Sequence, residues 1–105
     1  MLTLSQADSG SRRTVTVGDR IEVELEENPT TGYRWQVDVD AAKVRVVDDE
    51  HRSDSDAMGA PGRRILTFEV LQPGEVDLRL HYARSWDMNN AEGEFEVKLQ
   101  ESAAP

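Results

Sequence analysis

Side chains that could carry acid–base chemistry are limited to two histidines, His51 and His81, and the carboxylates around them. His81 occupies an outward position of an alternating segment beside Asp77 and Arg79, which is typical of a solvated face. His51 lies among acidic residues on a stretch expected to be flexible, with no rigid neighbour to orient its ring. The chain has no cysteine, which excludes a thiol nucleophile, a disulfide framework and a thiolate zinc site. We therefore expect neither catalysis nor a cofactor.

An acidic run offers a second chemistry, the binding of calcium. Calcium needs several oxygen ligands held by a defined turn. The run lacks the spaced aspartates and the glycine of a known calcium loop, so a solvated acidic loop is the better interpretation. A calcium-binding adhesion domain is the alternative, with ligands from Asp48, Asp49, Glu50, Asp54 and Asp56.

The most distinctive segment, residues 28–33, offers binding rather than reaction chemistry. Pro29 fixes its own backbone angle and restricts Asn28 to extended conformations. Gly32 allows a backbone conformation that other residues resist. Residues 28–32 carry no charge, so they would lose little hydration on entering a cleft of another protein. The segment reads Asn28, Pro29, Thr30, Thr31, Gly32 and Tyr33.

Two further polar segments contain residues typical of binding surfaces. Arg84 and Trp86 belong to types that are enriched at binding hot spots. Trp86 follows the last alternating position, so we expect an exposed indole; a tryptophan folded over the edge of the core is the alternative. In residues 53–64, composition alone favours a linker, but extended backbone could also be presented to a partner by Gly59, Ala60, Pro61 and Gly62.

Alternating apolar and polar residues dominate the rest of the chain and predict half-buried strands. Trp35 keeps this period and is assigned to the core. No window repeats apolar residues at helical spacing behind a cap. We therefore predict an all-β, immunoglobulin-like β-sandwich of about seven to eight strands. The expected strands are residues 14–17, 20–26, 33–39, 44–48, 64–71, 76–83 and 94–100.

Connection lengths predict where the polar segments meet. The connections after the second, fourth and sixth expected strands are long, whereas those between them are tight turns. Strands that run alternately up and down place every second connection at the same end. The three long loops should therefore share one pole, where loops on a rigid scaffold commonly bind partners. We call them the B–C loop (27–32), the D–E loop (49–63) and the F–G loop (84–93).

Length and charge restrict the partners. The chain has 105 residues, which is room for one domain, and a formal net charge of -9. Such a charge repels phosphate backbones and anionic membranes, so we expect a soluble monomer that binds neither nucleic acid nor membranes. Without an apolar leader, the protein would be cytoplasmic, or exported with its signal trimmed. We expect a flexible lead-in at 1–13, one domain at 14–100 and a tail at 101–105.

Together, the three loops resemble those of the chagasin family of cysteine-protease inhibitors. Residues 28–33 match the family signature Asn-Pro-Thr-Thr-Gly-Tyr, and a glycine-containing D–E loop and an Arg-x-Trp in the F–G loop follow in order. Ser85 stands where the family usually has proline, and residues 60–61 where glycines are common. The resemblance implies an immunoglobulin-like fold and reversible, non-covalent inhibition of papain-like (C1 family) cysteine proteases.

The resemblance also implies roles for single residues. The B–C loop would enter the catalytic cleft, with Thr30 and Thr31 near the catalytic Cys–His pair. Trp86 in the segment 84–87 would lie on the protease surface beside the cleft, and residues 59–62 would line its flank. The alternative is a non-catalytic immunoglobulin-like binding or adhesion module with no protease target. The implied binding residues are Asn28, Pro29, Thr30, Thr31, Gly32, Tyr33, Gly59, Ala60, Pro61, Gly62, Arg84 and Trp86.

Overall fold

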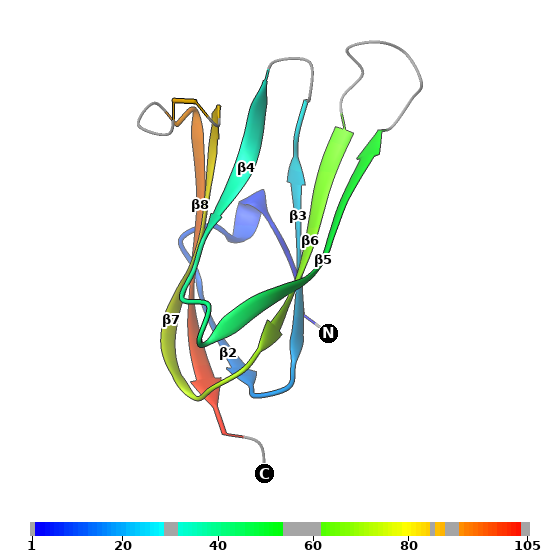
Figure 1. Ribbon diagram of the computed structural model, residues 1–105. Coiled ribbons are helices and arrows are strands. Elements are labelled where there is room, and N and C mark those ends of the chain that lie inside the picture. Colours follow the sequence, from blue (N-terminus) through cyan, green and yellow to red (C-terminus); the bar gives the residue numbers. More distant parts are fainter. Residues whose placement is uncertain (1, 29–31, 54–61, 85, 88–90, 104–105) are drawn as a thin grey trace.

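The chain folds into two four-stranded sheets packed face to face (Figure 1). The computed structural model describes residues 2–28, 32–53, 62–84, 86–87 and 91–103. One sheet has the strand order β1-β3-β6-β5 and the other β2-β8-β7-β4. This confirms the predicted all-β sandwich. The elements are β1 (Leu2–Ser5), the 3-10 turn η1 (Gln6–Asp8), β2 (Arg12–Thr16), β3 (Arg20–Glu26), β4 (Tyr33–Asp38), β5 (Val44–Ser53), β6 (Gly62–Val70), β7 (Gly74–Arg84) and β8 (Gly93–Ser102).

The core lies between the sheets, because successive strand residues point to opposite faces and each strand turns its apolar set inward. In β3, Ile21, Val23 and Leu25 are buried and the glutamates between them face outward. Trp35 is only 6% exposed, as expected from its strand period. Val37 departs from the same period and is exposed, since β4 is an outer strand with a neighbour on one side only.

The strand ends that the long connections join share one end of the sandwich, as predicted (Figure 1). Strands β3, β5 and β7 end there, and β4, β6 and β8 begin there. The tight connections lie at the opposite end. We call these ends the loop pole and the turn pole. None of the helical segments formed by the described residues has the length and apolar character needed to cross a membrane.

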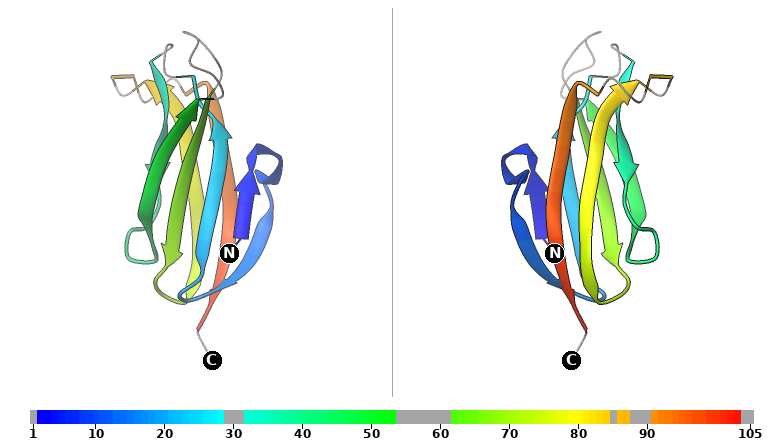
Figure 2. Two further views of the ribbon diagram at one scale, coloured as in Figure 1. Left: turned by 90° about the vertical axis from the view of Figure 1, so that its right-hand side faces the viewer. Right: turned by 90° about the vertical axis from the view of Figure 1, so that its left-hand side faces the viewer.

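Both ends of the chain differ from the expectation. Instead of a flexible lead-in, Leu2–Ser5 forms β1, which pairs in parallel with β3 (Figure 2) and buries Leu4. Two apolar residues in a four-residue strand are too few for a visible period, so the sequence pattern missed it. The expected tail at 101–105 is also wrong in part, because β8 continues to Ser102 and buries Glu101.

The D–E connection is shorter than expected, because β5 continues to Ser53 and β6 begins at Gly62. His51 therefore lies on a paired strand opposite Arg64, and the expectation of a flexible stretch around it is wrong. The pattern missed this extension because its side chains are charged on both faces. Their ion pairs replace the apolar contacts that alternation detects.

Candidate functional site

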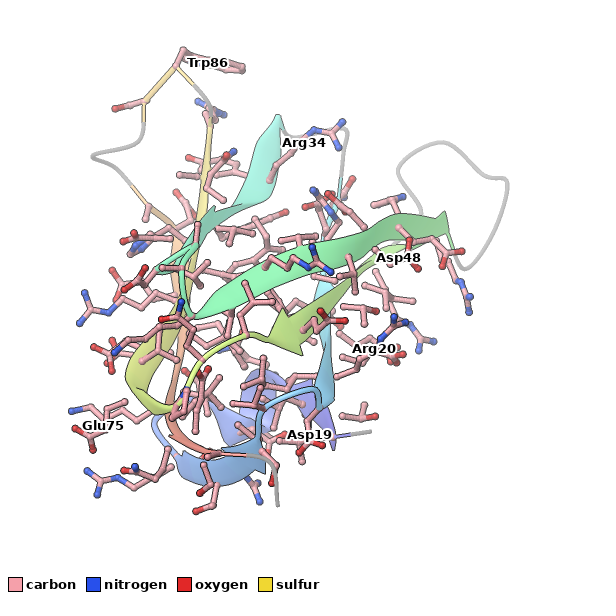
Figure 3. The ribbon with its side chains drawn as sticks, turned by 60° about the horizontal axis from the view of Figure 1, so that its bottom comes forward. Asp19, Arg20, Arg34, Asp48, Glu75 and Trp86 are labelled. Carbon is pink, nitrogen blue, oxygen red and sulfur yellow. The ribbon has the colours of Figure 1, made fainter. Side chains whose placement is uncertain are left out.

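The predicted binding residues divide between described and undescribed parts of the chain. Six lie outside the described residues, namely Pro29, Thr30, Thr31, Gly59, Ala60 and Pro61. The others, Asn28, Gly32, Tyr33, Gly62, Arg84 and Trp86, all belong to the strand ends and loops at the loop pole. Figure 3 shows Trp86 and Arg34 at this end of the molecule, away from Asp19 and Glu75 at the turn pole.

The B–C and F–G loops meet at Gly32, Tyr33, Arg84 and Trp86. The Arg84 guanidinium carbon lies 4.6 Å from the Tyr33 ring centroid and 5.9 Å from that of Trp86, so it interacts with both rings. Gly32 has φ 81°, and a Cβ atom there would lie 3.1 Å from Cη2 of Trp86. Glycine thus allows both the backbone turn and the close approach of the indole. The described parts of the two loops are therefore in direct contact.

Trp86 is 74% exposed, which confirms the expectation of an exposed indole. The chain turns sharply next to it, since the backbone N–H of Asp87 donates to the carbonyl of Arg84 at 3.0 Å. The Arg84 guanidinium, which lies over the Trp86 ring, also lies over the ring of Tyr33. The indole therefore contacts Arg84 and Gly32, while most of its surface is available to a partner.

Three aromatic rings support the base of the B–C loop. Tyr82 lies between Tyr33 and Trp35, with centroid distances of 5.5 and 5.0 Å. The Tyr82 hydroxyl accepts the backbone N–H of Asn28 at 3.2 Å, and the Trp35 indole donates to the carbonyl of Glu26 at 2.8 Å. The start of the loop is therefore hydrogen-bonded to Tyr82 and Trp35, and Tyr33 at its end packs against Tyr82.

The Tyr33 hydroxyl donates to Glu92 at 3.2 Å, which links the B–C loop to the last residues before β8. Loss of hydration raises the pKa of Tyr33, and the Glu92 carboxylate raises it further, while the charge of Arg84 opposes the change. Tyr33 therefore stays neutral and keeps its proton for this hydrogen bond.

A buried carboxylate, Glu27, lies at the start of the B–C loop. Its side chain accepts the backbone N–H of Trp35 at 3.0 Å and Nη1 of Arg64 at 3.1 Å. Nη1 of Arg34 lies 3.5 Å from it on the solvent side. Arg64 also donates two hydrogen bonds to the Asp49 carboxylate. These hydrogen bonds, together with the charge of Glu27, raise the pKa of Arg64.

The D–E loop is tied to the same place through Gly62. Its carbonyl accepts the backbone N–H of Glu27 at 3.0 Å. A Cβ atom at Gly62 would lie 2.9 Å from the carbonyl oxygen of Arg52 and from the ring of His51, so only glycine fits. Gly62 is buried and therefore acts in the structure as a packing position between β5 and β6.

Sequence reasoning missed Glu27, Tyr82, Arg64 and His51 as parts of this site. One signal was present, because Glu27 continues the inward period of residues 21, 23 and 25. A charged residue at such a position indicates a buried partner. The partners themselves come from strands far apart in the sequence.

The site is suited to recognition rather than to reaction. A hollow of about 530 Å³ lies beside the base of the B–C loop, lined by Gln6, Glu26, Glu27, Asn28, Trp35, Gly62 and Tyr82. Its one buried acid, Glu27, is already held by Arg64 and the Trp35 N–H. Within the described ranges, no three His, Asp or Glu side chains are grouped so that they could hold a metal ion. Asp49, considered above as a calcium ligand, pairs with Arg64.

Comparison with known proteins agrees with this geometry. The model of the chagasin family of peptidase inhibitors (I42) matches residues 14–99. The chain is 30% identical to amoebiasin-1 of Entamoeba histolytica over 101 residues, which cover 93% of this chain and 97% of that protein. It is 29% identical to chagasin of Trypanosoma cruzi over 89 residues, or 79% and 81% of the two chains. A crystal structure of a cysteine protease inhibitor from Entamoeba histolytica superposes with a TM-score of 0.85 at 20% identity, covering 94% of this chain and 93% of that one.

Proposed function

Because this chain belongs to the chagasin family of peptidase inhibitors, we propose that its loop pole blocks the active-site cleft of papain-like cysteine proteases. The chain is an inhibitor of cysteine proteases and not an enzyme. In the proposed complex residues 28–33 enter the cleft, with residues 59–62 on one flank and residues 84–87 on the other. Inhibition is reversible and non-covalent.

The contact between the B–C and F–G loops is the observation that carries this mode of binding. Gly32 lies close to the exposed indole of Trp86, and the Arg84 guanidinium lies over the rings of both Trp86 and Tyr33. Two of the three loops therefore reach a partner as one preformed surface. A preformed surface loses less conformational entropy on binding, which favours a tight complex.

The mechanism is occupation of the cleft without a reactive substrate bond. A papain-like protease acts on a carbonyl placed between its Cys–His pair and its oxyanion donors. The segment 28–32 is uncharged, so it would enter at small desolvation cost, and inhibition requires that it place no carbonyl in the geometry of attack. The exposed Trp86 adds the kind of aromatic anchor that dominates protein interfaces.

The test is inhibition of active-site-titrated papain by the purified chain. We expect competitive inhibition, full recovery of protease activity on dilution, and an intact inhibitor by mass spectrometry. The same assay separates this function from that of an adhesion module with no protease target. Absence of inhibition at micromolar concentrations of the folded chain would overturn the proposal.

A further inference from the structure

We propose that Glu27 is a positioning residue for inhibition: its buried carboxylate joins the stems of the B–C and D–E loops and sets where residues 28–32 leave the sandwich. This inference rests on the proposed function, because the effect to be measured is inhibition. Glu27 itself is buried, so it would act through the groups that it holds and not by direct contact with the protease.

The burial of Glu27 requires an explanation. The residue is 1% exposed, and a carboxylate loses a large hydration energy when it is buried unless charged and polar partners replace the water. It directly precedes Asn28, so it occupies the last position before the segment proposed to enter the cleft. A leucine or valine here would satisfy the inward period of β3 without that cost.

The partners of the carboxylate come from both sheets. Trp35 belongs to β4 in one sheet, and Arg64 belongs to β6 in the other. Since β4 is an outer strand, an N–H on its free edge has no strand partner, and Glu27 supplies the acceptor. The B–C loop crosses from β3 in one sheet to β4 in the other. The carboxylate therefore bridges the two stems of the loop directly.

The D–E stem is held by the main chain and side chain of the same residue. Nε2 of His51 lies 3.3 Å from the Glu27 carbonyl oxygen and 4.0 Å from its Oε1. The Glu27 N–H donates to the carbonyl of Gly62, and Arg64 continues the network to Asp49 on β5. One residue thus contacts the ends of β4, β5 and β6.

This arrangement fits a role in positioning the loop stems better than a role in stability alone. Buried ion pairs give little net stability compared with well-packed apolar side chains, but they accept only a narrow range of partner positions. Binding surfaces perform best when a supporting layer of hydrogen bonds fixes the residues that make contact. Glu27 supplies such a layer at the base of the loop, and the Tyr82 hydroxyl on Asn28 adds to it.

The decisive variants are Glu27→Gln and the double variant Glu27→Met/Arg64→Met. The first keeps the side-chain size but removes the charge, so the half-buried Arg64 keeps only Asp49 as an ion-pair partner and the melting temperature falls. The second replaces the pair by apolar groups of similar volume, which restores most of the stability but leaves the Trp35 N–H without its acceptor. Inhibition constants and dissociation rates are measured with papain at a temperature where circular dichroism shows each variant folded.

We expect both variants to inhibit papain at least about tenfold more weakly per folded molecule. Two matched controls should inhibit like the unmodified chain. Asp49→Asn removes the exposed partner of Arg64 and leaves Glu27 in place. Glu101→Gln changes an equally buried carboxylate at the turn pole.

The outcomes separate the two proposals. If the unmodified chain inhibits papain and the folded double variant inhibits it equally well, Glu27 has only a structural role and this inference is wrong. Equal weakening by Asp49→Asn would also overturn it, since the effect would then belong to the whole ion-pair network. If the unmodified chain does not inhibit papain, the proposed function itself fails.

Discussion

Two glutamates with the same burial lie at opposite poles of this sandwich, in very different surroundings. Glu27 at the loop pole is 1% exposed, and its carboxylate accepts hydrogen bonds from Trp35 and Arg64. Glu101 at the turn pole is 2% exposed, and neither of its oxygens has a hydrogen-bond partner among the described residues. Burial raises the pKa of Glu101 to about 7, with the charge of Lys43 opposing the change and that of Asp40 adding to it.

The difference shows that the polar interactions of buried acids are concentrated at the loop pole. At the loop pole, charged and aromatic side chains fix the stems of the loops that are proposed to bind a protease. At the turn pole, short turns leave little to position, and an unpartnered acid is tolerated at the cost of stability. Changes to the groups that fix or form the loops at the loop pole should therefore weaken inhibition, whereas a change to Glu101 at the turn pole should alter stability without altering inhibition.

The largest effect is expected at the tip of the B–C loop, whose described ends lie at the loop pole. Thr31→Asp, Thr31→Arg and Thr30→Arg each add charge to a segment proposed to lie in a desolvated cleft. We expect inhibition of papain to weaken at least ~100-fold, or about 2.7 kcal/mol, with melting temperatures nearly unchanged. Gln72→Arg adds the charge of the two arginine variants at the turn pole and should change neither quantity. Full inhibition by all three loop variants would mean that this loop stays outside the cleft.

Trp86→Ala should give the next largest effect. The indole is mostly exposed, so its removal should alter the free energy of unfolding by no more than about 0.5 kcal/mol. Binding to papain should weaken by roughly 2 kcal/mol, or about 30-fold, as expected for an aromatic anchor. A variant that unfolds while its folded fraction inhibits normally would assign Trp86 to the fold instead of the binding surface.

Glu101 should make stability depend on pH. Its folded-state pKa of about 7 lies above the ordinary value of 4.5, so the folded chain holds this proton more tightly than the unfolded chain. The contribution of protonated Glu101 to the free energy of unfolding is fully present below pH 4.5, and it is lost as the pH rises through about 7. Against Glu101→Gln, the unmodified chain should lose on the order of 2 kcal/mol between these limits, measured by urea unfolding. Parallel pH profiles for the two chains would contradict this prediction, because they would show that folding leaves the pKa of Glu101 unchanged.

A smaller effect is expected from Gly32→Ala. The positive φ disfavours a side chain by roughly 1 kcal/mol, and the new Cβ would press on the Trp86 ring. We expect a small loss of stability and a several-fold loss of inhibition. Gly18→Ala is the matched control, because it also has a positive φ but meets nothing within 4 Å. If both variants inhibit equally well, the contact between Gly32 and Trp86 does not shape the binding surface.

The sequence predicted those parts of the molecule that depend on local periodicity. Alternation identified the long strands and placed Trp35 inside, and connection lengths placed the loops at one pole. The sequence pattern did not predict strand β1, because four residues are too few to show a clear alternation. The pattern missed the Glu27 cluster because the pairing of β3 with β6 brings Arg64 to Glu27, and the pairing of β5 with β6 brings Asp49 to Arg64. Such cross-strand ion pairs carry no signal along the chain.

The most direct test of the central claim is calorimetric titration of papain in two states, with a free cleft and with the cleft filled by a peptide-like inhibitor bound to the catalytic cysteine. If the loop pole occupies the cleft, the chain binds free papain tightly and gives no heat of binding with the filled enzyme. Equal binding to both states would contradict the account, because the chain would then bind outside the active site.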